Sequence, residues 1–361
     1  MPSSSHAGRG WVCGLILFFF WAGPAGAVGP HDAPPGLERA VEHLCVEVLR
    51  GQSPDPELIA PLLAFVRSNA DASLGLPKFS GAPGAYQGFP IHLPMQRLLR
   101  YLYNPQIPQE VLKPFSIRSS VWTTSGSAEE QRRLWAHWPP AEHVLIRGEQ
   151  YDRTTPDPAT GGCYGMRLQR VILSLPAEKA VLSVSVQPEP SEVGRKGYAL
   201  GTDGDGRYVY SEDEGLTRAG LGWVSSRIQT NVSIGVYLEE GDGLVKSGIF
   251  QWMRAGWSGL SVVKESHVAA SLVRYRALLT VALNSALPAP EQLEALFTQA
   301  ASLSEESLRS HAQGVLRQWL AQAGQEKSPV AVKLLEDGFV RRLDLGELIA
   351  LRMRQTMTRP E

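Results

Sequence analysis

The stretch Trp223-Val-Ser-Ser-Arg-Ile-Gln-Thr-Asn-Val-Ser-Ile-Gly-Val-Tyr-Leu-Glu239 decides the fold. From residue 228 onward, the even positions are Ile228, Thr230, Val232, Ile234, Val236 and Leu238. The odd positions are Gln229, Asn231, Ser233, Gly235, Tyr237 and Glu239. Successive side chains of a β-strand point to opposite faces, so this period of two predicts a strand with one apolar and one polar face.

Other strands are expected on both sides of this stretch. They are predicted at residues 144–150, 166–175, 180–187, 197–202, 207–211 and 245–254. Asp-Gly turns lie within the segment Tyr198–Tyr210 and between Glu239 and Gly243. Such short turns join antiparallel neighbours, so the sequence predicts an antiparallel meander and not a sheet built from βαβ crossovers.

Helices are expected before and after the strands. The predicted segments are residues 37–50, 54–66, 95–103 and 128–138, followed by helices that begin near Ser266, Glu291, Ser302 and Asp344. Residues 76–94 are rich in glycine and proline and are expected to form a loop. The predicted fold class is therefore α+β: an antiparallel meander sheet of about six to eight strands, flanked by an N-terminal helical hairpin and C-terminal helices.

This order of elements divides the chain into four regions. Residues 1–27 form a signal peptide, and residues 28–140 form a helical N-terminal region rich in proline and glycine. Residues 141–287 form the antiparallel β region with a closing helix, and residues 288–361 form a C-terminal helical region.

The N-terminus has the layout of an export signal. An apolar run from Val12 to Ala22 is followed by Gly23-Pro24 and by the small residues of Ala25-Gly26-Ala27, where cleavage is predicted. The run is shorter than the ~20 residues that cross a bilayer, and no later run is long enough to do so. The mature chain is therefore expected in the periplasm or outside the cell, without a transmembrane span.

Composition excludes some classes of partner. The formal net charge is −1, so no overall attraction to nucleic acid is expected. The histidines are scattered, and neither a metal-ligand spacing nor a phosphate-binding glycine loop is present. The sequence therefore predicts no metal ligand, no cofactor and no convergent set of catalytic residues.

Two cysteines, Cys45 and Cys163, remain after signal cleavage. An even pair in an exported chain favours a disulfide between them. The alternative for Cys45 is a buried thiol, because it shares an apolar helix face with Leu37, Val41 and Leu44.

The strands followed by a long helix resemble the helix-grip architecture of START-like lipid-binding proteins, in which a curved sheet closes around a C-terminal helix. The residues behind the resemblance are Arg195–Ser211, the strand from Ile228, and Phe250–Leu279. They cover about a quarter of the chain, and the helices after Leu287 are additional to that plan. The resemblance implies an apolar cavity between the even face of the strand and the helix from Ser266.

The leading functional hypothesis is an exported envelope protein that binds a ligand or serves as a scaffold, without enzymatic activity. A sharper form of the hypothesis adds a hydrophobic or lipid-like ligand. The expected ligand-facing residues are Ile228, Val232, Ile234, Val236, Val268, Leu272 and Tyr275. In this hypothesis the odd face of the strand, with Gln229, Asn231, Ser233 and Tyr237, is exposed to solvent or lines a polar groove.

Two alternatives stay open. One is an exported hydrolase that uses the loop of residues 149–165, with Cys163 as nucleophile and His143 or His267 as base. The other is an envelope protein that docks a partner on its C-terminal helices.

Overall fold

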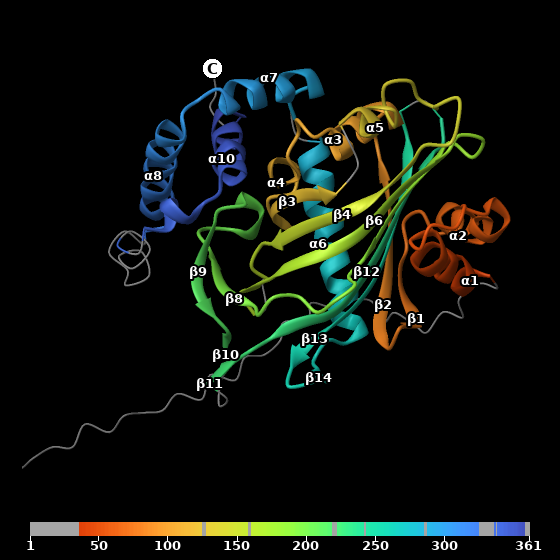
Figure 1. Cartoon of the computed structure of the whole chain (residues 1–361), viewed down its shortest axis with the longest axis horizontal. Coiled ribbons are helices and arrows are strands. Elements are labelled where there is room, and N and C mark those ends of the chain that lie inside the picture. Colours follow the sequence, from red (N-terminus) through yellow and green to blue (C-terminus); the bar gives the residue numbers. More distant parts are fainter. Residues whose placement is uncertain are drawn as a thin grey trace, which may run out of the picture.

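The computed structural model describes residues 36–124, 128–157, 160–218, 222–241, 243–284, 287–324, 336 and 338–357. The predicted export signal, residues 1–27, lies outside these ranges. The described residues form a large antiparallel sheet with helices before and after it, as Figure 1 shows. The predicted α+β class is confirmed.

Two helical segments begin the described chain. α1 (Leu37–Glu42) continues directly into the π-helical segment η1 (His43–Val48), and α2 (Pro56–Ser68) follows. Asp55 caps α2, because its Oδ1 accepts a hydrogen bond from the Glu57 N–H at 2.9 Å. Pro56 occupies the first helical position, where a missing N–H is tolerated. The predicted N-terminal helical hairpin is confirmed.

The large sheet has the strand order β1-β2-β13-β12-β7-β6-β4-β3, with β14 (Leu260–Ser261) paired to β13. All of its pairs are antiparallel. Six strands are neighbours in this sheet in their chain order, although short strands of other sheets intervene in the chain: β3 (Ile117–Thr124), β4 (Leu145–Thr154), β6 (Gly165–Leu175), β7 (Ala180–Val186), β12 (Arg227–Glu239) and β13 (Val245–Trp257). These strands form the predicted meander.

The edge of the sheet differs from the prediction. Residues 76–94 were expected to form a loop, but β1 (Ser73–Phe79) and β2 (Ala82–Ile91) form a hairpin that pairs with β13. Glycine is needed here for close approach: a Cβ on Gly84 would lie 2.3 Å from the Trp252 ring, and one on Gly88 would lie 2.1 Å from the Asn69 carbonyl oxygen.

The predicted hairpin at residues 197–211 is confirmed, but it belongs to a separate sheet. β8 (Arg195–Ala199) lies between β5 (Gly162–Cys163) and β9 (Tyr208–Glu214) in this small sheet. β10 (Leu216–Arg218) and β11 (Gly222–Val224) form a further pair. In the large sheet β12 lies between β7 and β13. The segment Arg195–Ser211 is therefore not part of the sheet that contains β12, and this part of the helix-grip resemblance is wrong.

The remaining helices confirm most of the predicted ones. They are α3 (Met95–Tyr103), α4 (Gln109–Leu112), α5 (Ala128–Arg132), α6 (Glu265–Asn284), α7 (Pro290–Ala301), α8 (Glu305–Gln322) and α10 (Leu345–Met357), with short 3-10 turns at η2 (Asp203–Asp205) and η3 (Phe339–Arg342). Among the described residues, none of these helices is both long and apolar enough to cross a membrane.

Both faces of the large sheet are covered by helices, on opposite sides in Figure 1. We call the face under α1, η1 and α2 the outer face and the face under α3 and α6 the inner face. The even side chains of β12 pack in the outer core: Val232, Ile234, Val236 and Leu238. The inner core contains Tyr237 of β12 together with Val268 and Leu272 of α6. The expectation that the even face packs on the helix from Ser266 is therefore wrong.

A third core lies beside the sheet. It joins the small sheet to the C-terminal helices through Tyr210, Leu316, Phe339 and Met353. Figure 1 shows β8 and β9 next to α8 and α10, away from α1 and α2. The helices α7, α8 and α10 follow α6 in the chain, so helices beyond the one from Ser266 are present, as the sequence predicted.

Candidate functional site

The seven expected ligand-facing residues do not line one common space. Val232, Ile234 and Val236 lie in the outer core, and Val268 and Leu272 lie in the inner core. Tyr275 is partly buried against the inner core. Ile228 lies in a small cluster with Met166 and Leu168, because a bulge between Ile228 and Thr230 shifts the register of β12.

The two cysteines also lie apart. Cys45 belongs to the outer core and Cys163 to the third core, and they form no disulfide among the described residues. Burial raises the pKa of the Cys45 thiol to about 12. The predicted disulfide is therefore wrong, and the alternative of a buried Cys45 thiol is confirmed.

The residues of the hydrolase alternative are not brought together. The Cys163 thiol donates a hydrogen bond to the Arg195 carbonyl oxygen at 3.2 Å. The His143 side chain is exposed, with Nδ1 2.9 Å from the Ser174 carbonyl oxygen. His267 is exposed at the start of α6, where its Nδ1 accepts from the Lys264 N–H at 3.3 Å. Neither histidine lines the cavity that contains Cys163.

The inner face is unusually polar for the interior of a sheet. Outer-face Ile234 and Val236 are each 0% exposed, so the outer face is fully packed at these positions. On the inner face of the same interior strands, Asn231 and Ser233 of β12 and Gln251 of β13 are polar and remain partly exposed. The Gln251 Nε2 donates to the Asn231 Oδ1 at 3.3 Å. Water-accessible space therefore borders this part of the inner face.

Two cations and three tyrosines meet where α3, α4 and α6 cover the inner face. We call this group the inner polar cluster: Tyr103, Lys113, Arg170, Ser183, Tyr237 and Tyr275. The Arg170 Nη2 donates to the Ser183 Oγ at 2.7 Å, and Tyr103 also forms a hydrogen bond with Ser183. Burial raises the pKa of all three tyrosine hydroxyls, so they are neutral donors at physiological pH.

Lys113 is the second cation of this cluster. It follows α4, and its side chain reaches the interior near Arg170. Burial, and next the positive charge of Arg170, lower the pKa of the Lys113 ammonium to about 8, whereas Asp152 and Glu110 act in the opposite direction. Lys113 is therefore still protonated at pH 7, but at a cost to the folded state.

The sequence interpretation missed this cluster. Arg170 carried a usable signal, because it shares its strand face with Leu168 and Ile172, where an apolar residue is expected. Lys113 carried no such signal, since it lies beside a four-residue helix between prolines.

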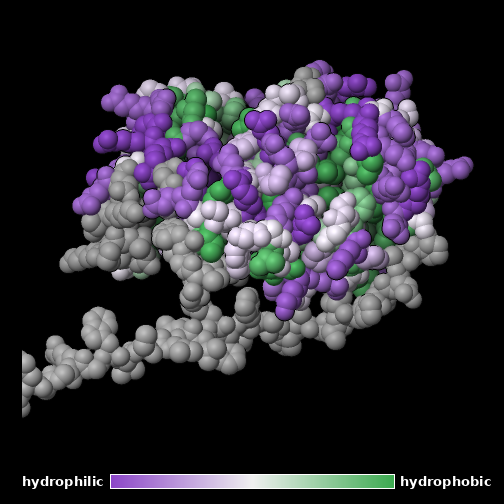
Figure 2. Space-filling model, turned by 60° about the horizontal axis from the view of Figure 1, so that its bottom comes forward, coloured by the Kyte–Doolittle hydropathy of each residue, from purple (hydrophilic) through white to green (hydrophobic). Residues whose placement is uncertain are grey.

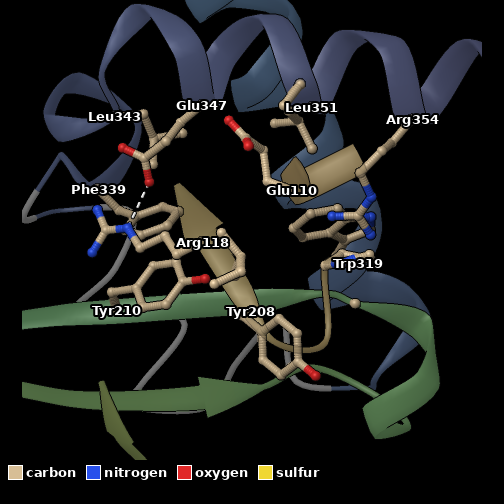
Figure 3. Close-up of a pocket in the computed structure, with 14 residues that line it drawn as sticks. Glu110, Arg118, Tyr208, Tyr210, Trp319, Phe339, Leu343, Glu347, Leu351 and Arg354 are labelled. Atoms are coloured by element: carbon tan, nitrogen blue, oxygen red, sulfur yellow. Dashed lines mark hydrogen bonds and ion pairs between the residues drawn. The ribbon is translucent and has the colours of Figure 1, made fainter. Parts of the chain in front are cut away.

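A cavity of about 70 Å³ lies beneath α10 and is shown in Figure 3. The Arg118 Nε donates to the Glu347 Oε1 at 2.6 Å, and the Arg118 guanidinium carbon lies 4.0 Å from the centre of the Tyr210 ring. Glu110 lines the same cavity, and its Oε2 is buried without a hydrogen-bond partner among the described residues. Burial, with smaller contributions from Asp344 and Glu347, raises the pKa of Glu110 to about 7.

Replacing Glu110 by glutamine is expected to stabilise the protein above pH 7. A carboxyl with a pKa near 4.5 when unfolded and about 7 when folded contributes stability below pH 4.5, and that contribution is lost as the pH rises through 7. At pH 8 the Glu110→Gln variant should gain about 3 kcal/mol in free energy of unfolding, and at pH 4.5 almost nothing. Urea unfolding at both values measures this, and an equal gain at both would contradict the buried ionisation.

A second cavity, of about 280 Å³, is also lined by Arg118. Its lining includes Arg118, Arg153, Arg195, Arg342, Glu192 and Cys163. Three of its four arginines have carboxylates of their own: Arg118 and Arg153 pair with Glu347 and Asp344, and Arg195 lies 3.5 Å from Glu214. The arginine charge of this cavity is therefore largely balanced within the chain.

The face in Figure 2 shows separate hydrophobic areas among hydrophilic ones. On the described part of the C-terminal helices, the exposed large hydrophobic residues are Leu303 and Leu345. Docking of a partner there stays a prediction. Likewise, no group of three or more metal-ligating side chains occurs among the described residues.

Comparisons with known proteins identify no family for this chain. No protein-family model matches the sequence, and no curated protein matches it. Among solved structures, this chain is similar to the human StarD13 (DLC2) lipid transfer and protein localization domain. The alignment covers 64% of this chain and 96% of that one, at 11% sequence identity and a TM-score of 0.29, and neither fold nor function is inferred from it.

Proposed function

We propose that this protein is an exported binding protein that holds an amphiphilic, lipid-like ligand against the inner face of its sheet. The observation that supports this most is the contrast between the two faces of β12. On the outer face Val232, Ile234, Val236 and Leu238 are excluded from solvent, whereas inner-face Asn231 and Ser233 are polar and partly exposed. Polar, accessible side chains at interior positions of a sheet do not add the stability that buried apolar side chains would add there, so a role in ligand binding explains them.

The ligand class follows from what surrounds these groups. The inner core packs beside these groups with apolar side chains that include Phe89, Ile249 and Leu272. The inner polar cluster supplies convergent hydroxyls and cations. Ligand sites are mostly apolar with a few placed polar groups, and such a lining suits a ligand with one apolar and one polar part.

The test is to find a ligand and to block its site. The full chain, exported from an expression host, is examined by native mass spectrometry and by solvent extraction, and titrated with dansylaminoundecanoic acid as a fluorescent probe. The Ser233→Trp variant should fill the inner face and abolish probe binding. The matched control Val281→Trp, at a position 67% exposed on α6, should bind normally.

The proposal fails if the folded wild-type protein carries no extractable ligand and does not bind the probe. It also fails if Ser233→Trp binds as well as the control. Circular dichroism of both variants separates a blocked site from a misfolded one.

Export is the second part of the proposal, and it is supported by the signal layout of residues 1–27. The mature protein should begin at Val28, which intact mass or N-terminal sequencing of the exported protein measures. A product that retains Met1 and stays in the cytoplasm of the host would contradict it.

A further inference from the structure

Arg170 is a cation on the inner face that has no counter-ion among the described residues. It lies on β6, an interior strand of the large sheet, and its side chain is on the inner face. Its Nη2 donates to the neutral Ser183 hydroxyl, while its Nε is buried and has no hydrogen-bond partner among the described residues. A buried guanidinium N–H without an acceptor costs free energy that ordinary surface arginines do not pay.

Lys113 is the second such cation. Within the described part of the chain, its ammonium makes neither a hydrogen bond nor an ion pair, and the charge of Arg170 acts on it unfavourably. Two like charges in an enclosed space raise the cost of each other, so both side chains would be poorly placed in a core that stays empty.

The carboxylates nearby do not neutralise this pair. Asp152 acts on Lys113, but its Oδ1 already accepts hydrogen bonds from the Ser120 hydroxyl at 2.7 Å and from the Gln150 amide. Glu110 lines the cavity beneath α10 and is only partly ionised at neutral pH. Neither carboxylate lies within ion-pair distance of Arg170 or Lys113 among the described residues, so the positive charge of the pair is not neutralised locally.

Neutral donors complete the surroundings. The Tyr103, Tyr237 and Tyr275 side chains interact with Arg170 or with one another, and they come from α3, β12 and α6. Arg170, Lys113 and Tyr275 are each partly exposed, so they border accessible space. Guanidinium, ammonium and hydroxyl donors that converge on such a space match the several acceptor oxygens of one anionic group.

We infer that Arg170 and Lys113 form an anion-binding site on the inner face, and that the ligand of this protein carries a carboxylate or phosphate group which binds between them. The inference rests on the proposed function and adds the charge of the ligand to it. A neutral amphiphile would leave both cations unpaired in a drier interior, so it should bind less tightly than an anionic one.

The experiment compares dansylaminoundecanoic acid with its methyl ester, which has the same apolar chain and no charge. The wild-type chain should bind the acid at least about tenfold more tightly than the ester. Arg170→Gln, which can still donate to Ser183, should weaken acid binding by about tenfold or more and leave ester binding unchanged. Lys113→Met should act in the same direction.

The matched control is Arg167→Gln. Arg167 lies on the same strand, but its side chain is 70% exposed and on the other face, so this variant should bind the acid as the wild type does. Thermal unfolding of all three variants checks that each is folded. Removing an uncompensated cation should not lower the unfolding temperature of Arg170→Gln.

Two competitors distinguish the source of the anion. Dodecyl phosphate that displaces the acid probe, and depends on Arg170, would support a phosphate group on an amphiphile. Displacement by inorganic phosphate alone would support the anion site and overturn the amphiphilic ligand.

The remaining outcomes separate the two proposals. Equal binding of acid and ester, insensitive to Arg170→Gln, would overturn the anion site and leave the proposed function standing. Binding of neither probe, with no extractable ligand, would overturn both.

Discussion

The Ile234→Ala variant should lower the free energy of unfolding by about 2–5 kcal/mol, the range for removing a fully buried isoleucine side chain from a core. Ile234 is 0% exposed and lies at the centre of the outer core, beneath the N-terminal helical hairpin. Its neighbours come from the helices and from strands β7 and β13, so the cavity left by the substitution could not collapse easily. Urea unfolding monitored by tryptophan fluorescence measures the change.

The adjacent residue is the matched control. Ser233 lies on the inner face of the same strand, where it is partly exposed. Ser233→Ala should change the free energy of unfolding by less than about 1 kcal/mol, because neither a cavity nor an unpaired buried partner results. Equal losses for the two variants would show that the faces of β12 are assigned wrongly.

The Glu347→Gln variant should cost about 3 kcal/mol, near the lower end of the range for removing one partner of a buried ion pair. The side chains of Arg118 and Glu347 are only 11% and 6% exposed. The amide keeps the size of Glu347 and still accepts from the Asp344 N–H, a bond of 3.0 Å that caps α10. The loss therefore reports the uncompensated charge of Arg118 and not the loss of the cap.

Two further variants test this explanation. Glu305 occupies the corresponding first turn of α8 and pairs with Arg309, but it is 58% exposed, so Glu305→Gln should cost about 0–1 kcal/mol. The double variant Arg118→Met/Glu347→Gln should recover most of the loss, because it removes both charges and keeps the acceptor for the Asp344 N–H. A double variant as unstable as Glu347→Gln would instead indicate that packing, and not charge, dominates beneath α10.

The helices were predictable where local signals agree. The Asp344-Leu-Gly-Glu347 pattern predicted the start of α10, and in the structure the Glu347 N–H donates to the Asp344 Oδ1 at 2.8 Å while the Glu347 carboxylate accepts from the Asp344 N–H. Such a capping box involves residues three apart, so the sequence contains both partners.

The β1–β2 hairpin was not predictable in the same way. Glycines and prolines between residues 76 and 94 favour a loop by their intrinsic preferences. They form strands because β2 pairs with β1 and β13, and glycine is required where the Trp252 ring and the Asn69 carbonyl oxygen approach Gly84 and Gly88. Those partners are far away in the sequence, so local composition could not reveal them.

The sequence by itself determined that residues 227–239 form a strand with two chemically different faces. Alternation is a local property, since it depends only on the geometry of neighbouring residues. Only the tertiary structure decided which helices cover each face. The apolar face packs under α1, η1 and α2, and the polar face lies under α3 and α6, near Arg170 and Lys113. This assignment depends on contacts between segments up to about two hundred residues apart, and no period in the sequence records them.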